Sequence, residues 1–376
     1  MMGSDTMTTR TDAGESAVRG PLGLKTKDEG IETLRAFAIF LVVAAHVVND
    51  PEMDPADDLY EYLNNSFKAI RMPLFTAISG YLYGLRPVRP GKLAGFLRGK
   101  ARRLVLPLIV VSGLEYFFSA VMPGVNQPEV LSGIWRVVFF PYEHFWFLQV
   151  VAIIFVLVAV LDRYGWLQRD AVFLTVAGFS VLAFLYYDRL DLDLSLFSLG
   201  TVTYLLPFFL VGYAFSARSA WFSKWLPTPA LLVLFGVGLA LQQWAWFTDA
   251  GFDTTRRSYV GLAIAIGSAS LLLRHRVAIP GVHRVGSHAY AIYLYQGFGT
   301  AVGRRIVDAA GITSPHLYIL GVVGIALLFG IVVEVVLRRS SWLRVPFLGL
   351  RGADRRPSAP PAGHGAVGSR SESRVP

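Results

Sequence analysis

The feature that most constrains this chain is a succession of long apolar segments. Ten segments are long enough to cross a hydrocarbon core of about 30 Å. Only 16% of the residues are charged and 54% are hydrophobic, whereas a soluble domain averages about 25% charged residues. The sequence therefore predicts an all-α integral membrane protein, a bundle of about ten transmembrane helices. The expected spans are 31–49, 69–85, 104–122, 144–161, 171–187, 201–217, 228–247, 258–274, 288–306 and 316–337.

The charges between these spans predict the orientation of the bundle. If the N-terminus is cytoplasmic, the dense basic run 86–103 falls inside the cell and the acidic stretch 50–61 falls outside. This distribution follows the positive-inside rule, with Arg304 and Arg305 as exceptions. We therefore expect both termini in the cytoplasm. Polar residues 1–30 and 346–376 are expected to form disordered cytoplasmic tails around a transmembrane domain over 31–345.

Composition also narrows the chemistry. The chain has no cysteine, which excludes disulfides and a thiol nucleophile. Its seven histidines form no HExxH-like cluster, so no metal site is expected. The net charge is +9, and the basic residues lie between the apolar spans. This distribution indicates membrane topology and contact with membrane lipids. No nucleic acid is expected as a partner.

Arg35 and His46 both lie in the first span, where a charged side chain is costly and is by default a functional candidate. At about 100° per residue, the eleven steps between them return to within about 20° of the same direction, about 16 Å along the helix axis. One helix face is therefore predicted to present a cation near the cytoplasm and an imidazole near the outer end.

Asp50 follows His46 by one helical turn, within reach of its side chain. A carboxylate at this place would orient the ring and stabilise its protonated form, as the acid of a catalytic triad does. Pro51 is expected to end the helix near Asp50. Asp50 is equally well interpreted as a solvated loop residue, and both interpretations stay open.

Arg71, His144 and Trp146 are expected at the same outer level as His46, because they open the second and fourth spans. An arginine that reaches the lipid headgroups explains Arg71 without a specific function, and an interfacial aromatic belt explains Trp146. The belt does not explain His144. In the ninth span, Tyr293 and Gln296 share a face, and a buried glutamine needs partners, so this face is expected to point into the bundle.

The basic run 86–103 holds seven cations within eighteen residues, more than orientation requires. It includes Arg98, Arg102 and Arg103 at the entrance to the third span. Binding of anionic lipid is one explanation. Binding the phosphates of a nucleotide-like ligand is the other, because arginine forms bidentate contacts with phosphate.

Together these pieces resemble the bacterial acyltransferase 3 family, in particular its single-domain members similar to fucose O-acetylase-like proteins. The matching pieces are the spacing from Arg35 to His46, MPLFTAISGYLYG at 72–84, RLVLP at 103–107, HFWFL at 144–148, YLLPFFLVG at 204–212 and GSHAYAIYLYQ at 286–296. They occur in the family's order. The family often has histidine where this chain has Gln296, and aspartate where it has Glu32.

The resemblance implies a multi-pass protein of the bacterial plasma membrane that transfers an acyl group from cytoplasmic acyl-CoA to a hydroxyl, usually on a sugar. It implies acetyl-CoA as the usual donor. It also implies a catalytic role for His46 and functions for Arg35 and the basic run around Arg103. The function predicted for this chain is therefore that of an acyl-CoA-dependent O-acyltransferase acting on a sugar or glycan.

In this hypothesis His46, assisted by Asp50 if that carboxylate points inward, takes the proton of the acceptor hydroxyl, which then attacks the thioester. The variant is a transient acyl-histidine. The predicted donor site comprises Arg35, Arg98, Arg102, Arg103 and Tyr293, and the predicted acceptor side comprises Arg71, His144, Trp146 and Gln296. The alternative is a multi-pass transporter or flippase for a glycan or small metabolite, which would use the same intramembrane charges as a relay. Binding of CoA separates the two classes.

Overall fold

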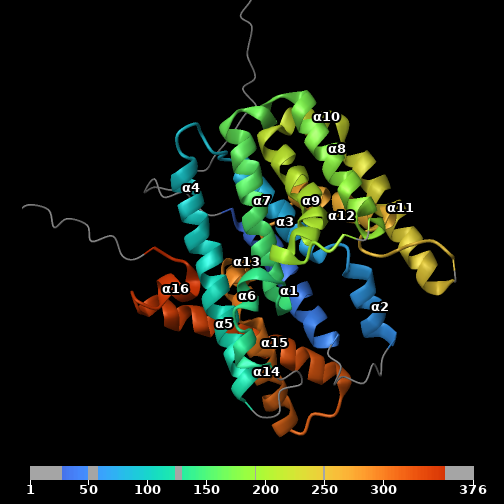
Figure 1. Ribbon diagram of the computed structural model, residues 1–376. Helices are drawn as coiled ribbons and strands as arrows, with labels where there is room; N and C mark the ends of the chain where they lie inside the picture. The colour runs from blue at the N-terminus through green and yellow to red at the C-terminus, as the bar shows by residue number, and fades with distance from the viewer. Residues whose placement is uncertain (1–27, 50–57, 123–128, 191, 249, 352–376) are drawn as a thin grey trace, which may run out of the picture.

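The computed structural model describes residues 28–49, 58–122, 129–190, 192–248 and 250–351 (Figure 1). Every regular element within these residues is a helix, which confirms the all-α prediction. Each of the ten predicted spans coincides with one helix. These helices are α1 (Glu29–Val48), α3 (Arg71–Gly84), α5 (Leu106–Val121), α7 (Trp146–Arg163), α8 (Asp170–Tyr186), α9 (Leu199–Ala217), α11 (Thr228–Phe247), α12 (Tyr259–Arg274), α14 (Ala289–Ala309) and α15 (Pro315–Arg339).

Seven helical segments in the described part are long and apolar enough to cross a membrane, and they contain α1, α5, α7, α8, α9, α11 and α15. Of the other three, α12 is apolar but shorter, and α3 has only 14 residues. Helix α14 is long, but it carries Gln296, Arg304 and Arg305. The count of ten spans and the cytoplasmic position of both termini therefore stay predictions.

Shorter helices connect the long ones. They are α2 (Asp58–Phe67), α4 (Leu93–Lys100), α6 (Arg136–Phe139), α10 (Ser219–Trp225), α13 (Val282–Ser287) and α16 (Arg344–Leu348). The Asp28 side chain caps α1 by accepting a hydrogen bond from the Ile31 amide at 3.2 Å, and Leu348 of α16 is buried. The folded part thus extends slightly beyond 31–345 at both ends, while the expected tails otherwise lie outside the described residues.

Glycines allow the closest helix contacts. Gly80 of α3 lies against the Phe209 carbonyl of α9, and Gly212 of α9 lies against the Ala77 carbonyl of α3, with no room for a β-carbon at either place. Gly299 and Gly303 likewise bring α14 against α15. Small residues serve this purpose in membrane helix packing, where close approach of the backbones replaces hydrophobic burial.

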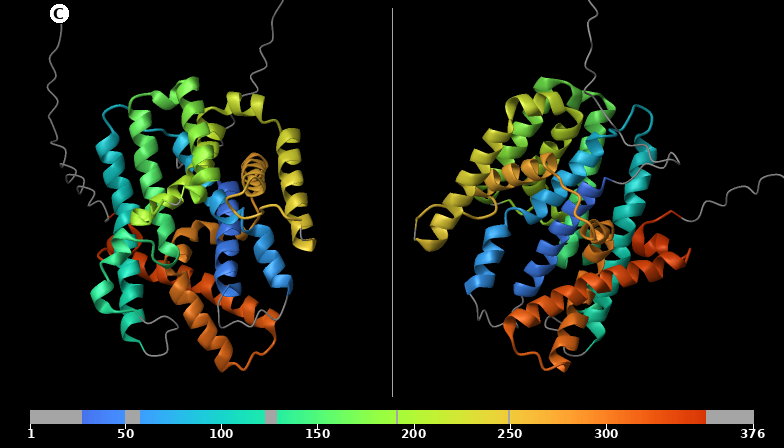
Figure 2. Two further views of the ribbon diagram at one scale, coloured as in Figure 1. Left: turned by 45° about the vertical axis from the view of Figure 1, so that its right-hand side comes forward. Right: turned by 180° about the vertical axis from the view of Figure 1, so that it is seen from behind.

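Helix α1 lies at the centre of the bundle and packs against α3, α13, α14 and α15. The pair α14 and α15 crosses the direction of α1 (Figure 2), and α13 approaches so closely that Gly286 touches the Glu32 carbonyl of α1. The two ends of α1 consequently face different neighbours, and each end carries one of its two functional candidates.

Candidate functional site

The first group of candidate residues surrounds the end of α1 at His46. The ring of His46, in the last turn of α1, lies 6.0 Å from the ring of His144, at an interplanar angle of 71°. His144 belongs to a single turn, η3 (Glu143–Phe145), directly before α7. The His46 side chain is exposed, whereas His144 is 5% exposed. The fold therefore brings together two histidines that are 98 positions apart (144 − 46).

His144 is held by its surroundings but keeps one nitrogen free. The Tyr293 hydroxyl of α14 donates a hydrogen bond to the His144 carbonyl. The rings of Tyr293 and Phe145 lie 5.3 Å and 4.1 Å from the His144 ring. In the part of the chain that the structure describes, the buried Nε2 of His144 has no hydrogen-bond partner. A buried, unpaired ring nitrogen is costly, and a ligand would satisfy it.

Arg71 and Gln296 belong to the same end of the bundle. Arg71, the first residue of α3, lies close enough to His46 for their charges to interact. It donates one hydrogen bond, to the Asn64 carbonyl at 3.2 Å. Gln296 follows Tyr293 by one turn of α14 and is 1% exposed. The expected partners of Gln296 are absent among the described residues, because neither atom of its amide makes a hydrogen bond there.

The two remaining predicted members of this site are Trp146 and Asp50. The Trp146 ring contacts Phe147 at 6.1 Å and packs against the core that α7 and α9 share. Asp50 lies outside the described residues, so its proposed role beside His46 stays a prediction.

The opposite end of α1 carries the cations. Arg35 forms an ion pair with Glu32 at 3.0 Å. Lys100, at the end of α4, lies close enough to both Arg35 and Arg103 for their charges to interact, and its ammonium sits 3.3 Å from the centre of the Phe155 ring. The structure thus places Arg35 and Arg103, from distant parts of the sequence, around one point.

A π-helical turn, η1 (Ala101–Val105), carries Arg102 and Arg103 between α4 and α5. Such turns are rare and are frequent at functional sites. Arg102 Nε donates to the Gly349 carbonyl at 3.4 Å. Gly349 has a φ of +63° and lies against the Arg103 backbone, so a larger residue would be strained there. The exposed Arg98 lies on α4, one turn before Arg102.

Tyr293 does not lie where the donor-site prediction placed it. It contacts His144, whereas Tyr290, one turn earlier on α14, donates a hydrogen bond to the Arg103 carbonyl. The reason is the helical rise of about 1.5 Å per residue, which separates the two hydroxyl groups along α14. Tyr290 is therefore the tyrosine that the structure associates with the basic run.

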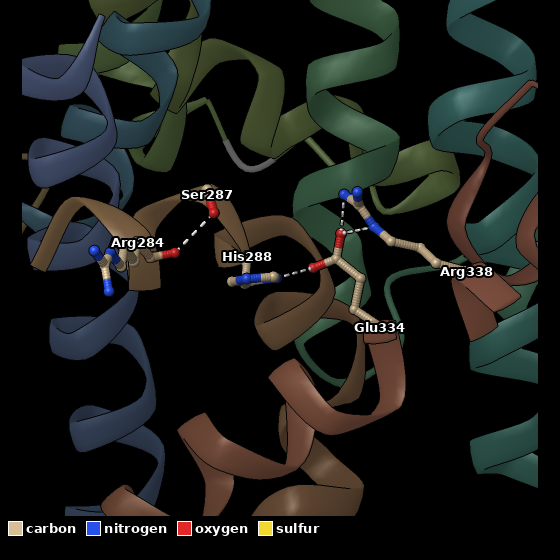
Figure 3. A network of polar contacts seen from close by, with 5 residues as sticks. All are labelled: Arg284, Ser287, His288, Glu334 and Arg338. Carbon is tan, nitrogen blue, oxygen red and sulfur yellow. Dashed lines mark hydrogen bonds and ion pairs between the residues drawn. The ribbon is translucent and has the colours of Figure 1, made fainter. Parts of the chain in front are cut away.

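Two buried carboxylates were missed by sequence reasoning. Glu334 of α15 accepts hydrogen bonds from His288 Nδ1 at 2.7 Å and from Arg338 Nε at 2.9 Å, and Figure 3 shows it between them. Glu115 of α5 lies against Gly297 of α14 and has a buried oxygen without a partner in the described part. Both glutamates lie inside expected spans, so the rule that singled out Arg35 and His46 would have found them.

The fold and the site define a class of protein. The described helices form a membrane bundle with two histidines at one end of its central helix and a cluster of cations at the other. Such an arrangement provides a base for an alcohol at one end and contacts for an anionic group at the other.

Comparison with known proteins identifies the family. The acyltransferase domain of the acyltransferase 3 family matches residues 28–335, and the chain belongs to this family. The seven apolar helices and the family together indicate a multi-pass membrane protein. The nodulation protein NolL of Mesorhizobium japonicum is 26% identical over 206 residues, which are 54% of this chain and 51% of NolL. The match thus spans about half the length of that relative. No solved structure matches the chain.

Proposed function

We propose that this protein is an O-acyltransferase that moves an acyl group, acetyl in the usual case, from acyl-CoA to a hydroxyl of a sugar or glycan in the bacterial plasma membrane. One observation carries the proposal. The central helix has the His46–His144 pair at one end and Arg35, beside Lys100 and Arg103, at the other. Membership of an acyltransferase family supports the reaction type.

In the proposed reaction, His46 accepts the proton of the acceptor hydroxyl as the oxygen attacks the thioester carbonyl. A carbon–oxygen bond forms, the carbon–sulfur bond breaks, and CoA leaves as a thiolate that takes the proton back from the imidazolium. The products are the ester and free CoA. Because the chain has no cysteine, no thioester with the enzyme is formed.

The oxyanion of this reaction needs hydrogen-bond donors that are already in place. The unpartnered Nε2 of His144, whose ring neighbours that of His46, and the unpartnered amide of Gln296 on α14 supply candidates. At the cytoplasmic end, Arg35, Arg98, Arg102, Arg103 and Lys100 would hold the phosphates of CoA, since guanidinium groups bind phosphate with two parallel hydrogen bonds. The donor thioester would then approach His46 along α1.

The experiment is turnover of acetyl-CoA by the purified chain in detergent with a panel of sugars, alongside His46→Ala and His275→Ala. His275 is a matched control because it is an exposed histidine directly after α12 and is assigned to neither group. The proposal expects His46→Ala to lose transfer, while His275→Ala retains it. A wild-type protein that neither binds nor consumes acyl-CoA would favour a transporter or flippase instead.

A further inference from the structure

Three cations gather near His46: Arg71, which was described above, and two further residues, Lys68 and Arg256. Arg71 begins α3, Lys68 precedes it, and Arg256 lies just before α12. The charge of Arg71 interacts with those of both His46 and Arg256. Residues from two parts of the chain therefore form one cationic rim, defined as Lys68, Arg71 and Arg256, next to the proposed base.

The two arginines of this rim both lie near the buried Tyr204 of α9. The Arg256 guanidinium lies 5.5 Å from the centre of the Tyr204 ring, and the buried Tyr204 is also an electrostatic neighbour of Arg71. An arginine that only reaches for lipid headgroups would extend away from the bundle. The inward neighbours of Arg71, namely His46 and Tyr204, distinguish it from that case.

The two arginines of the rim form no ion pair with a carboxylate in the described part of the chain. Two arginines elsewhere in the described part form ion pairs: Arg257 with Asp188 at 3.6 Å and Arg276 with Asp28 at 2.9 Å. Within the described ranges, no carboxylate lies at ion-pair distance from Arg71 or Arg256. Burial lowers the pKa of the Lys68 ammonium, the nearby Asp253 carboxylate opposes this shift, and Arg71 adds to it.

A half-buried guanidinium without an anionic partner is costly, and an oxyanion removes that cost. The buried, unpartnered Nε2 of His144, whose ring neighbours that of His46, adds a polar group that a ligand at the same place could reach. Guanidinium groups suit phosphate and carboxylate alike, because both accept two parallel hydrogen bonds. The side chains around His46 therefore suit a sugar with an oxyanion close to its reacting hydroxyl.

We propose that the acceptor is an anionic sugar, whose phosphate or carboxylate is bound by Arg71 and Arg256 while its hydroxyl meets His46. This inference rests on the proposed function, since it assigns the substrate class of the same site. The rim selects the acceptor by charge and also orients it, because the anion fixes one end of the sugar ring.

The test is equilibrium binding of glucose 6-phosphate, glucuronate and glucose to the full chain in phosphatidylcholine nanodiscs. The two anionic sugars should bind more tightly than glucose by roughly tenfold, which corresponds to about 1.4 kcal/mol. Arg256→Gln should remove this difference. Arg136→Gln should preserve it, since Arg136 is also exposed and stacked on a ring, that of Phe140, but lies on α6.

Equal binding of the three sugars, or equal effects of the two substitutions, would overturn the proposal. A second arm uses phosphatidylglycerol nanodiscs. If the rim binds lipid headgroups, glucose 6-phosphate binding disappears there and the proposal fails; unchanged binding supports it. CoA binding by the same preparation without any sugar reports separately on the proposed function, because binding of the donor needs no acceptor.

Discussion

At the scale of single residues, Glu334 joins the ends of two helices through one buried carboxylate. It is 6% exposed, and it binds His288 at the start of α14 as well as Arg338 of its own helix (Figure 3). A buried acceptor that holds two donors stabilises their arrangement, and losing its charge weakens both bonds. Glu334 therefore has a structural role that its position in an apolar span does not reveal.

Glu334→Gln should lower the free energy of unfolding by about 1–3 kcal/mol, because hydrogen bonds to a charged group are stronger than those to an amide. Thermal or denaturant unfolding in mixed micelles measures the change. Glu61→Gln is the control, since Glu61 is exposed on α2 and its replacement should have little effect. Equal stability of the two variants would show that the Glu334 contacts contribute nothing.

Much of the candidate site could be predicted from the sequence, because helical geometry fixes relative positions within one span. The spacing of Arg35 and His46 follows from such geometry, whereas the shared level expected for His46, Arg71 and His144 follows from the alternation of spans across the bilayer. The partner of each side chain does not follow, because it depends on how helices rotate against each other. That is why Tyr293 was placed with the donor, although it lies at His144.

At the scale of elements, the contact between α3 and α9 depends on two glycines. Gly80 and Gly212 each face a carbonyl of the other helix, so the two backbones touch. This contact holds α3, which begins with Arg71, in place against the rest of the bundle. An added methyl group would force the helices apart or strain both of them.

Gly80→Ala should therefore destabilise the protein by about 1–3 kcal/mol, the usual cost of overpacking. Gly178→Ala is the matched control, because Gly178 lies within α8 with open space where a β-carbon would go. Unfolding temperatures of the two variants in one detergent give the comparison. If Gly80→Ala is as stable as Gly178→Ala, the close contact of α3 and α9 is not present in the membrane.

The π-helical turn η1 gives a prediction about the donor. Arg103→Gln should raise the KM for acetyl-CoA by roughly tenfold, since one charge-assisted phosphate contact contributes about 1.5 kcal/mol or more. Its kcat should change less, because Arg103 lies at the other end of α1 from His46. Steady-state kinetics test this against Arg169→Gln, an exposed cation between α7 and α8. A similar KM for both variants would remove Arg103 from the donor site.

At the scale of the whole molecule, the sequence predicted the position of every long helix but not how each meets the membrane. Apolar length marks a span only when a helix is continuous and faces lipid. Helix α3 is short, and α14 carries polar residues toward the bundle. Length and apolarity therefore do not decide whether either helix crosses the membrane. Helices α8 and α11, which are long, apolar and mostly exposed, meet both conditions of length and apolarity.

The natural absence of cysteine makes the topology directly measurable, since any introduced cysteine is unique. With both termini in the cytoplasm, Thr313→Cys between α14 and α15 should react with a membrane-impermeant maleimide in intact cells. Lys92→Cys, before α4, should react only after lysis. Both positions are exposed. Labelling of Lys92→Cys in intact cells would contradict the predicted orientation.

The central claim is that α1 separates donor binding at Arg35 from base catalysis at His46. The most direct measurement is the Kd for CoA of His46→Ala and Arg35→Gln, with turnover recorded on the same samples. His46→Ala should bind CoA as the wild type does, while its kcat falls by about 10²–10⁴, the usual contribution of a general base. Arg35→Gln should instead bind CoA more weakly. Full turnover by His46→Ala, or unchanged CoA binding by Arg35→Gln, would contradict this division of roles.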